Sequence, residues 1–283
     1  MDTPVLLIRT FLLRPYVFAF LAVFLFCSAR LLGWRRTGLF FALTWATAFL
    51  CEFSSTRTGI PFGWYYYTGS TVGQELYLSN IPFMDSLSFT FLLYASYCLA
   101  LLFLLPARAG NLLVSGEWGR PGWPELIFDQ GVRTSWPILA LTALFFAFID
   151  MVIDPVALRG DRWFLGKIYY YPDPGIHFGV PLANYVGWAV VGLVALSIYF
   201  PVDRRLSVPT PRDGRSATGA VLLGCGLYYG VLAFNLSVTF WIDEMLLGLT
   251  GVLLYLPITV LAVLRLLSRL PVHSPVQRPE GGR

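Results

Sequence analysis

Charged side chains are scarce in this chain of 283 residues: they make up 13% of it, against about a quarter in an average soluble domain. Hydrophobic side chains make up 57% and gather in long runs. There are only two histidines, His177 and His273, and a single lysine, Lys167. This composition excludes a disordered chain, a coiled coil and an ordinary cytosolic enzyme, and it indicates an integral membrane protein.

Several motifs of known enzyme classes are also missing. Two histidines are too few for the histidine clusters of a membrane di-iron hydroxylase or desaturase. The sequence has no Walker motif, no GxGxxG after a strand and no GxSxG elbow. Its four cysteines lie in or beside apolar runs without CxxC spacing, which argues against a disulfide framework or a zinc site. The basic residues form no dense stripe, so we expect no nucleic-acid partner.

The apolar runs predict seven membrane-spanning helices, because a helix needs about 20 mostly apolar residues to cross a bilayer. The predicted spans are 13–32, 38–54, 82–105, 135–154, 181–201, 218–240 and 244–264. The expected fold class is therefore an all-α, polytopic membrane bundle. We expect one domain over residues 1–270, followed by a disordered cytoplasmic tail over 271–283.

The distribution of basic residues predicts the orientation of the bundle. With seven spans, alternate loops fall on opposite sides, and 6 basic residues lie on the side of the N-terminus against 14 on the other. Positive residues favour the cytoplasmic side. We therefore expect the chain in the inner (plasma) membrane, with its N-terminus outside and its C-terminus in the cytoplasm.

Two parts of the sequence repeat a pattern of three tyrosines followed by a helix that starts at a proline. The tyrosines at 65–67 precede Pro82, and those at 169–171 precede Pro181. The offset is 104 residues for the tyrosines and 99 for the prolines. The repeat units cover about 38–106 and 135–201 and have the same orientation. Paired repeats in membrane proteins often meet at a central site.

Six of the 16 acidic residues lie inside or at the ends of apolar runs, where a carboxylate costs about 2.5–3.5 kcal/mol even on a lenient scale. They are Glu52, Asp85, Asp150, Asp154, Asp243 and Glu244. All six fall on the side of the tyrosine-rich loops. Asp150 and Asp154 are four residues apart and share one helix face. Two such carboxylates cannot easily both ionise, so one should remain a proton donor near neutral pH.

Structural explanations stay open for each of these residues. Interfacial acids also cap helices, or would bridge to Arg57 and Arg159. Tyrosine and tryptophan form belts at membrane interfaces whatever the function, although aromatic faces also stabilise a cation by about 0.5–2 kcal/mol. A lone histidine such as His177 is more often a hydrogen-bonded structural residue than a base.

Three segments carry a resemblance to a known family. Residues 52–62 read EFSSTRTGIPF, residues 153–157 read IDPVA, and residues 177–188 read HFGVPLANYVGW. Together they resemble the membrane-integral carotenoid 1,2-hydratases, which include the bisanhydrobacterioruberin hydratases, over roughly residues 45–200. The arrangement is also similar to the small membrane lycopene cyclases. Those pair an RTG-aromatic-Tyr loop with a Pro-acid-acid helix start, whereas Phe83, Met84 and Asp85 follow Pro82 here.

The resemblance implies that water is added across the terminal C1=C2 double bond of an acyclic carotenoid, without a cofactor. A protonated aspartate would donate its proton to C2, and a second carboxylate would activate the water that attacks the cation at C1. We expect Asp154 and Asp150 to be the acid pair, Glu52 to be the base or their partner, and Asp85 to be a weaker fourth. The expected substrate-binding residues are Tyr65, Tyr67, Tyr169, Tyr171, Trp188, His177, Arg57 and Asn184, of which the last two would orient polar groups.

The expected partners are the lipid bilayer, an apolar carotenoid and other enzymes of carotenoid synthesis. Three alternatives stay open. A lycopene-type cyclase would share the first proton transfer but exclude water. A non-enzymatic protein would bind carotenoid unchanged. A prenyltransferase would hold Mg²⁺ with Asp150 and Asp154 and would need a second acidic cluster, for which only Asp243 and Glu244 are at hand.

Overall fold

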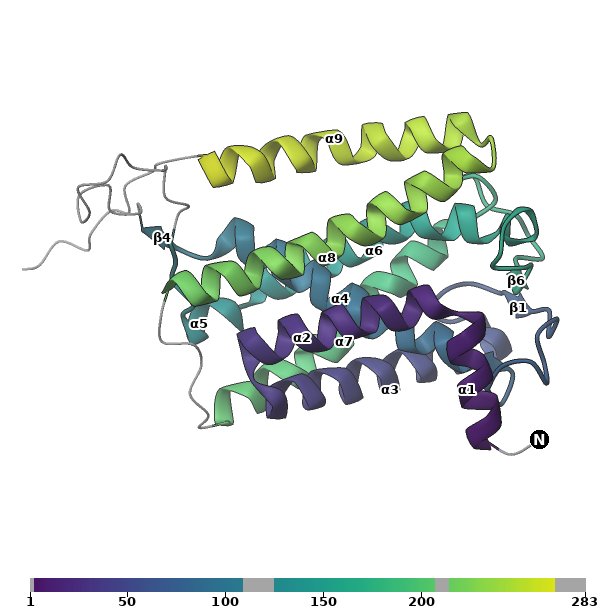
Figure 1. Cartoon of the computed structure of the whole chain (residues 1–283), viewed down its shortest axis with the longest axis horizontal. Helices are drawn as coiled ribbons and strands as arrows, with labels where there is room; N and C mark the ends of the chain where they lie inside the picture. Colours follow the sequence, from purple (N-terminus) through teal and green to yellow (C-terminus); the bar gives the residue numbers. More distant parts are fainter. Residues whose placement is uncertain (1–2, 109–124, 207–213, 268–283) are drawn as a thin grey trace, which may run out of the picture.

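The computed structural model of the chain describes residues 3–108, 125–206 and 214–267 (Figure 1). Its helices are α1 (Thr3–Leu13), α2 (Pro15–Leu32), α3 (Trp34–Thr58), α4 (Phe83–Leu104), α5 (Gln130–Arg133), α6 (Trp136–Ala157), η1 (Gly160–Arg162), α7 (Leu182–Arg205), α8 (Gly214–Trp241) and α9 (Met245–Leu267). Its strands are β1 (Tyr66–Tyr67), β2 (Tyr77–Leu78), β3 (Ile81–Pro82), β4 (Ala107–Arg108), β5 (Glu125–Leu126) and β6 (Tyr169–Tyr170).

Seven helices in the described part of the chain are long and apolar enough to cross a membrane. They are α2, α3, α4, α6, α7, α8 and α9, and each overlaps one of the seven spans predicted from sequence. The all-α, polytopic bundle is thus confirmed. The predicted tail at 271–283 lies outside the described residues.

Proline and glycine set several helix ends. Pro15 begins α2, where a missing N–H costs no helical hydrogen bond. Gly59 ends α3 in the left-handed conformation, with φ of 75°. Its N–H donates to the carbonyl of Ser55. These ends release the chain into the aromatic loop that follows α3.

The long helices run back and forth between two ends of the molecule, and the tyrosine loops lie at one of them (Figure 1). Strands β1 and β6 lie at this end, which we call the aromatic end, while β4 and α5 lie at the opposite end. Helix α1 lies across the aromatic end instead of joining the bundle (Figure 1). Helix α1 is apolar but too short to span a bilayer, so it has no counterpart among the spans predicted from sequence.

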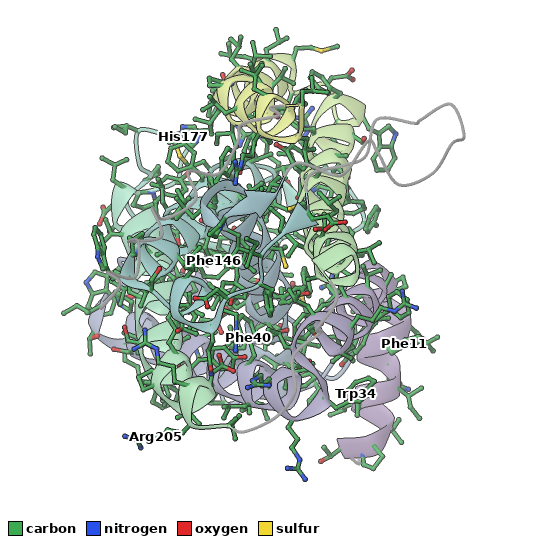
Figure 2. The ribbon with its side chains drawn as sticks, turned by 90° about the vertical axis from the view of Figure 1, so that its left-hand side faces the viewer. Phe11, Trp34, Phe40, Phe146, His177 and Arg205 are labelled. Carbon is green, nitrogen blue, oxygen red and sulfur yellow. The ribbon has the colours of Figure 1, made fainter. Side chains whose placement is uncertain are left out.

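Helix α4 is the centre of the bundle. Its side chains are buried around most of its circumference, and it packs against α2, α3, α6 and α8. Phe40 and Phe146 lie inside the bundle, whereas Phe11, Trp34 and Arg205 lie at its edge (Figure 2). Helices α3 and α4 of the first repeat unit therefore pack directly on α7 and α6 of the second.

The two tyrosine loops pair with each other. Tyr66 lies opposite Tyr170 and Tyr67 opposite Tyr169 in an antiparallel ladder between β1 and β6. The pair Tyr66–Tyr170 joins equivalent positions of the two repeat units, at the offset of 104 residues. This short ladder brings both loops over the same group of helix ends.

Candidate active site

The first polar group at the aromatic end joins two acids through one tyrosine. Tyr67 Oη lies 3.0 Å from Oε1 of Glu52, near the end of α3, and 2.6 Å from Oδ2 of Asp85, in the first turn of α4. The hydroxyl of Ser86 also donates to Glu52. Glu52 is buried, whereas Tyr67 and Asp85 are half-buried.

The second polar group gathers three donors around one acid. Asp154, near the end of α6, accepts hydrogen bonds from the hydroxyls of Tyr169 and Tyr171, each at 2.6 Å. Asn184, in the first turn of α7, donates to Asp154 at 2.8 Å and to Asp150 at 2.5 Å. One amide nitrogen can serve both acids because it carries two hydrogens.

The two groups follow the internal repeat. Tyr67 and Tyr171 are equivalent at the offset of 104 residues, and Asp85 and Asn184 are equivalent at the offset of 99. Each tyrosine hydroxyl lies within hydrogen-bond distance of an acid on the helix before its loop, which is Glu52 in one unit and Asp154 in the other. The site is thus built twice, but an amide stands in the second unit where the first has a carboxyl.

None of these four carboxyl groups forms an ion pair in the described part of the chain. The ion pairs there join Arg14 to Glu75, Arg36 and Arg133 to Asp203, and Arg159 and Arg162 to Glu244. A buried charge without a partner is very unfavourable. Some of the four carboxyl groups must therefore carry a proton, as a proton donor requires.

The hydrogen bonds of Tyr67 indicate where one proton lies. Burial, and then the charges of Asp85 and Glu52, raise the pKa of Tyr67 well above its usual range, so its phenol stays protonated. A phenol has one hydrogen to donate and lies within hydrogen-bond distance of two carboxyl groups. Both contacts are satisfied when one of these carboxyls is protonated and donates to the phenol oxygen.

Asp154 is suited to the opposite role. It accepts from Tyr169, Tyr171 and Asn184, and hydrogen bonds donated to a carboxylate stabilise its charged form. Burial, and then the charge of Asp154, raise the pKa of Tyr171 well above its usual range, so this phenol also remains a donor. The geometry therefore favours an ionised Asp154 opposite a protonated carboxyl of the Glu52–Asp85 pair.

Two cavities meet at these acids. A cavity of about 110 Å³ is lined mainly by apolar and aromatic side chains of α2, α4, α6, α7 and α8. A smaller cavity of about 40 Å³ contains the polar groups, including Glu52, Tyr67 and Asn184. Both cavities are lined by Asp85, Phe89, Asp154, Tyr169 and Trp188. The smaller cavity, with about 40 Å³ between polar groups, is large enough for a water molecule.

Most of the site residues expected from sequence come together here. Glu52, Asp85 and Asp154 line the smaller cavity, together with Tyr65, Tyr67, Tyr169, Tyr171, Asn184 and Trp188. Asp150 lines neither of the two cavities and reaches the group only through Asn184. Arg57 stays outside, exposed, where its guanidinium contacts the ring of Phe53 and donates to Ser79.

His177 has a structural role in this geometry. Pro155 has no N–H to bond the carbonyl of Met151, four residues earlier in α6. The Nε2 atom of His177 donates to that carbonyl at 3.0 Å. The histidine thus satisfies the backbone group that the proline leaves free, one turn from Asp154.

Several residues of the site were missed from sequence. Ser88, Phe89 and Leu92 line the larger cavity on the same face of α4 as Asp85, and helical spacing from Asp85 was the signal that would have found them. Phe20 from α2 and Asn235 from α8 line it too. No sequence signal indicated these last two, because their position depends on how distant helices pack.

Asp243 and Glu244 do not join the other four acids. Glu244 accepts from Arg159 at 3.0 Å and also pairs with Arg162. The six acids do lie at one end of the bundle, as expected, but they divide into two sets. Glu52, Asp150 and Asp154 are buried and Asp85 is half-buried, while Asp243 and Glu244 lie in an outer loop. One of the two acids of the second cluster that a prenyltransferase would need, Glu244, is therefore engaged in ion pairs with arginines.

Comparison with known proteins gives a family and one relative. The family model described as "Carotenoid biosynthesis protein" matches residues 12–257. The bisanhydrobacterioruberin hydratase of Haloarcula japonica is 30% identical over 171 residues, which cover 60% of this chain and 47% of that protein. The match thus spans about half the length of this relative. No solved structure matches the chain.

Proposed function

The chain belongs to the carotenoid biosynthesis protein family, and we propose that it adds water to the terminal C1=C2 double bond of an acyclic carotenoid. One observation carries the proposal: Asp85 and Asp154 line both an apolar cavity and an adjoining polar one. The apolar cavity suits the hydrocarbon end of the substrate, and the polar cavity suits the water. The similarity to a hydratase supports the same reaction.

Asp85 is the proton donor in this mechanism. It passes a proton to C2, and the electron pair of the double bond forms the new C–H bond, which leaves a tertiary cation at C1. Phe89 and Trp188 are stacked with ring centroids 4.2 Å apart, and both line the two cavities. Aromatic faces in this position stabilise the cation by about 0.5–2 kcal/mol each.

Asp154 is the base. Water in the polar cavity attacks C1, and Asp154 accepts the proton that the water loses. The product is a tertiary alcohol, and no redox step occurs. This division of roles differs from the acid pair Asp154 and Asp150 expected from sequence, because Asp150 lines neither cavity and Asp154 receives three donated hydrogen bonds.

Glu52 reprotonates Asp85 through the hydroxyl of Tyr67. A proton on Glu52 moves to the phenol oxygen while the phenol proton moves to Asp85, along contacts of 3.0 and 2.6 Å. The relay leaves Asp85 neutral and ready for the next substrate. Glu52 and Asp154 both line the polar cavity, and the proton that Asp154 accepted from the water returns to Glu52 through it, which restores both acids for the next cycle.

Replacing Tyr67 by phenylalanine is expected to lower turnover about tenfold to hundredfold, less than the loss of a direct proton donor. The ring and its packing remain, and only the relay hydroxyl is removed. The measurement is hydrated product per folded protein over time. Tyr66→Phe is the matched control, since Tyr66 is exposed and opposite Tyr170 in the ladder. Equal rates for the two variants would exclude the relay.

The reaction itself is tested by expressing the chain in a bacterium that makes lycopene and analysing the pigments by mass spectrometry. We expect a product heavier than lycopene by one water molecule. An unchanged mass with altered retention and absorption would indicate cyclisation instead. Unaltered lycopene beside well-expressed protein would indicate either a protein that binds carotenoid without changing it or an enzyme for a longer acyclic carotenoid. The same experiment in a host that makes a longer acyclic carotenoid separates these two outcomes.

The protein is an integral membrane protein, and we propose that its aromatic end faces outwards. The distribution of basic residues supports this orientation, with 14 of the 20 on the side opposite the N-terminus. The lipid bilayer surrounds the bundle, and the carotenoid reaches the acids from within it. Contact with other enzymes of carotenoid synthesis is part of the same proposal.

A further inference from the structure

An apolar groove runs along the outside of the bundle between α2 and α8. Its volume is about 460 Å³, in the range of small-molecule binding sites. Phe20 and Val23 of α2 form one wall. Three leucines and the glycines Gly219, Gly226 and Gly230 of α8 form the other. No polar side chain is among the residues that line it.

The groove lies next to the cavity that holds the acids. Phe20 lines both. On α8 the lining residues recur at three- and four-residue spacing, which marks one helix face. The same face continues to Val231 and Phe234, which line the acid-containing cavity. Phe234 follows Gly219 by 15 residues, so the stripe is about 22 Å long at 1.5 Å per residue.

The three groove glycines keep this face open. A Cβ added at Gly219, Gly226 or Gly230 would meet no atom of the described chain within 4 Å. Gly224 differs, because a Cβ there would clash with Cys98 of α4. Internal packing therefore explains Gly224, but it does not explain the three glycines that line the groove.

We propose that the groove binds the linear polyene chain of the substrate while the reacting end lies in the acid-lined cavity. This inference rests on the proposed function and deepens it by assigning the rest of the substrate to a place. The lining is wholly apolar and suits a ligand without polar groups. The lining face of α8 is elongated and extends to the acid-lined cavity beside Phe20, so a straight chain lying along it would reach Asp85 only with its end.

Two other molecules would fit the groove, and each predicts a different experimental result. Gly226 and Gly230 are four residues apart, a spacing at which membrane helices also pack on one another. A second copy of the chain would use the groove in that way. A lipid acyl chain would also fit an apolar groove that is open to the bilayer.

The test fills the groove by replacing Gly226 with leucine in the full chain, reconstituted in nanodiscs. Lycopene is the probe, and its binding is followed by quenching of tryptophan fluorescence. The variant should bind lycopene at least about tenfold more weakly, since contact with two or more methylene-sized groups is lost. Turnover of lycopene should fall with it. Gly38→Leu is the matched control, because Gly38 is exposed on α3 and an added Cβ there also meets nothing within 4 Å.

Each outcome decides between the occupants. Lycopene binding that is unchanged in Gly226→Leu, or absent in the parent protein, overturns the proposal. If native mass spectrometry finds that this variant loses only a dimer or a bound phospholipid, the groove belongs to that occupant instead. If the parent protein binds lycopene without adding water, and the variant does not bind it, the groove assignment stands while the proposed hydration fails.

Discussion

Replacing Asp85 by asparagine is expected to lower hydration of the acyclic carotenoid by about 10²- to 10⁴-fold, the usual contribution of a general acid. Asp85 lines both cavities and lies 2.6 Å from the relay hydroxyl of Tyr67. An amide keeps the size of the side chain but has no acidic proton for C2. The measurement is product formed per folded protein, by mass spectrometry.

This substitution should leave the fold intact. Asparagine already occupies the equivalent position of the second repeat unit, Asn184, where it donates to two acids. The control is Asp173→Asn, which changes an exposed acid in the aromatic loop of the second unit. If Asp85→Asn keeps turnover within about threefold of the parent protein, the loss is smaller than that expected for removal of a general acid. Proton donation would then be assigned to another carboxyl.

Replacing Asp154 by asparagine should affect both turnover and stability. Turnover should fall by about 10²- to 10⁴-fold, because no carboxylate then takes the proton from water. Asp154 also accepts from Tyr169, Tyr171 and Asn184. Its amide can accept at one atom only, so a buried donor is left unmatched, at a cost of about 1–3 kcal/mol. Thermal unfolding in detergent measures this part.

Asp150→Asn is the matched control for Asp154→Asn. Asp150 lies one turn away on the same helix face and shares the Asn184 amide, yet it lines neither cavity. It should therefore keep much more activity than Asp154→Asn. If Asp150→Asn were the more damaging of the two, the roles of the two acids would have to be exchanged.

The sequence predicted the helices well for a physical reason. In a bilayer, backbone groups must bond within their own segment, so a long apolar run becomes a helix wherever it packs. All seven predicted spans overlap the observed ones. The side of each loop follows from counting the spans. That count placed Glu52, Asp85, Asp150 and Asp154 at one end, together with both tyrosine loops.

The division of roles within the site could not be predicted in the same way. Asp243 and Glu244 met the same criteria as the other acids, but Glu244 pairs with Arg159 and Arg162 instead. Asp85 was expected to be a weaker fourth acid, and it is the one of the Glu52–Asp85 pair that lines both cavities. Arg57 was expected at the site and is exposed on the surface.

The sequence by itself determined a membrane bundle, its repeat and the end at which the acids gather, because these depend on hydrophobicity and chain direction alone. Only the tertiary structure decided which carboxyl of the Glu52–Asp85 pair lines both cavities, which acid accepts three hydrogen bonds and which lies beside Tyr67. Those properties depend on how α4 and α6 are rotated against α2, α7 and α8. Side-chain contacts between distant segments set that rotation, and no local pattern in the sequence records it.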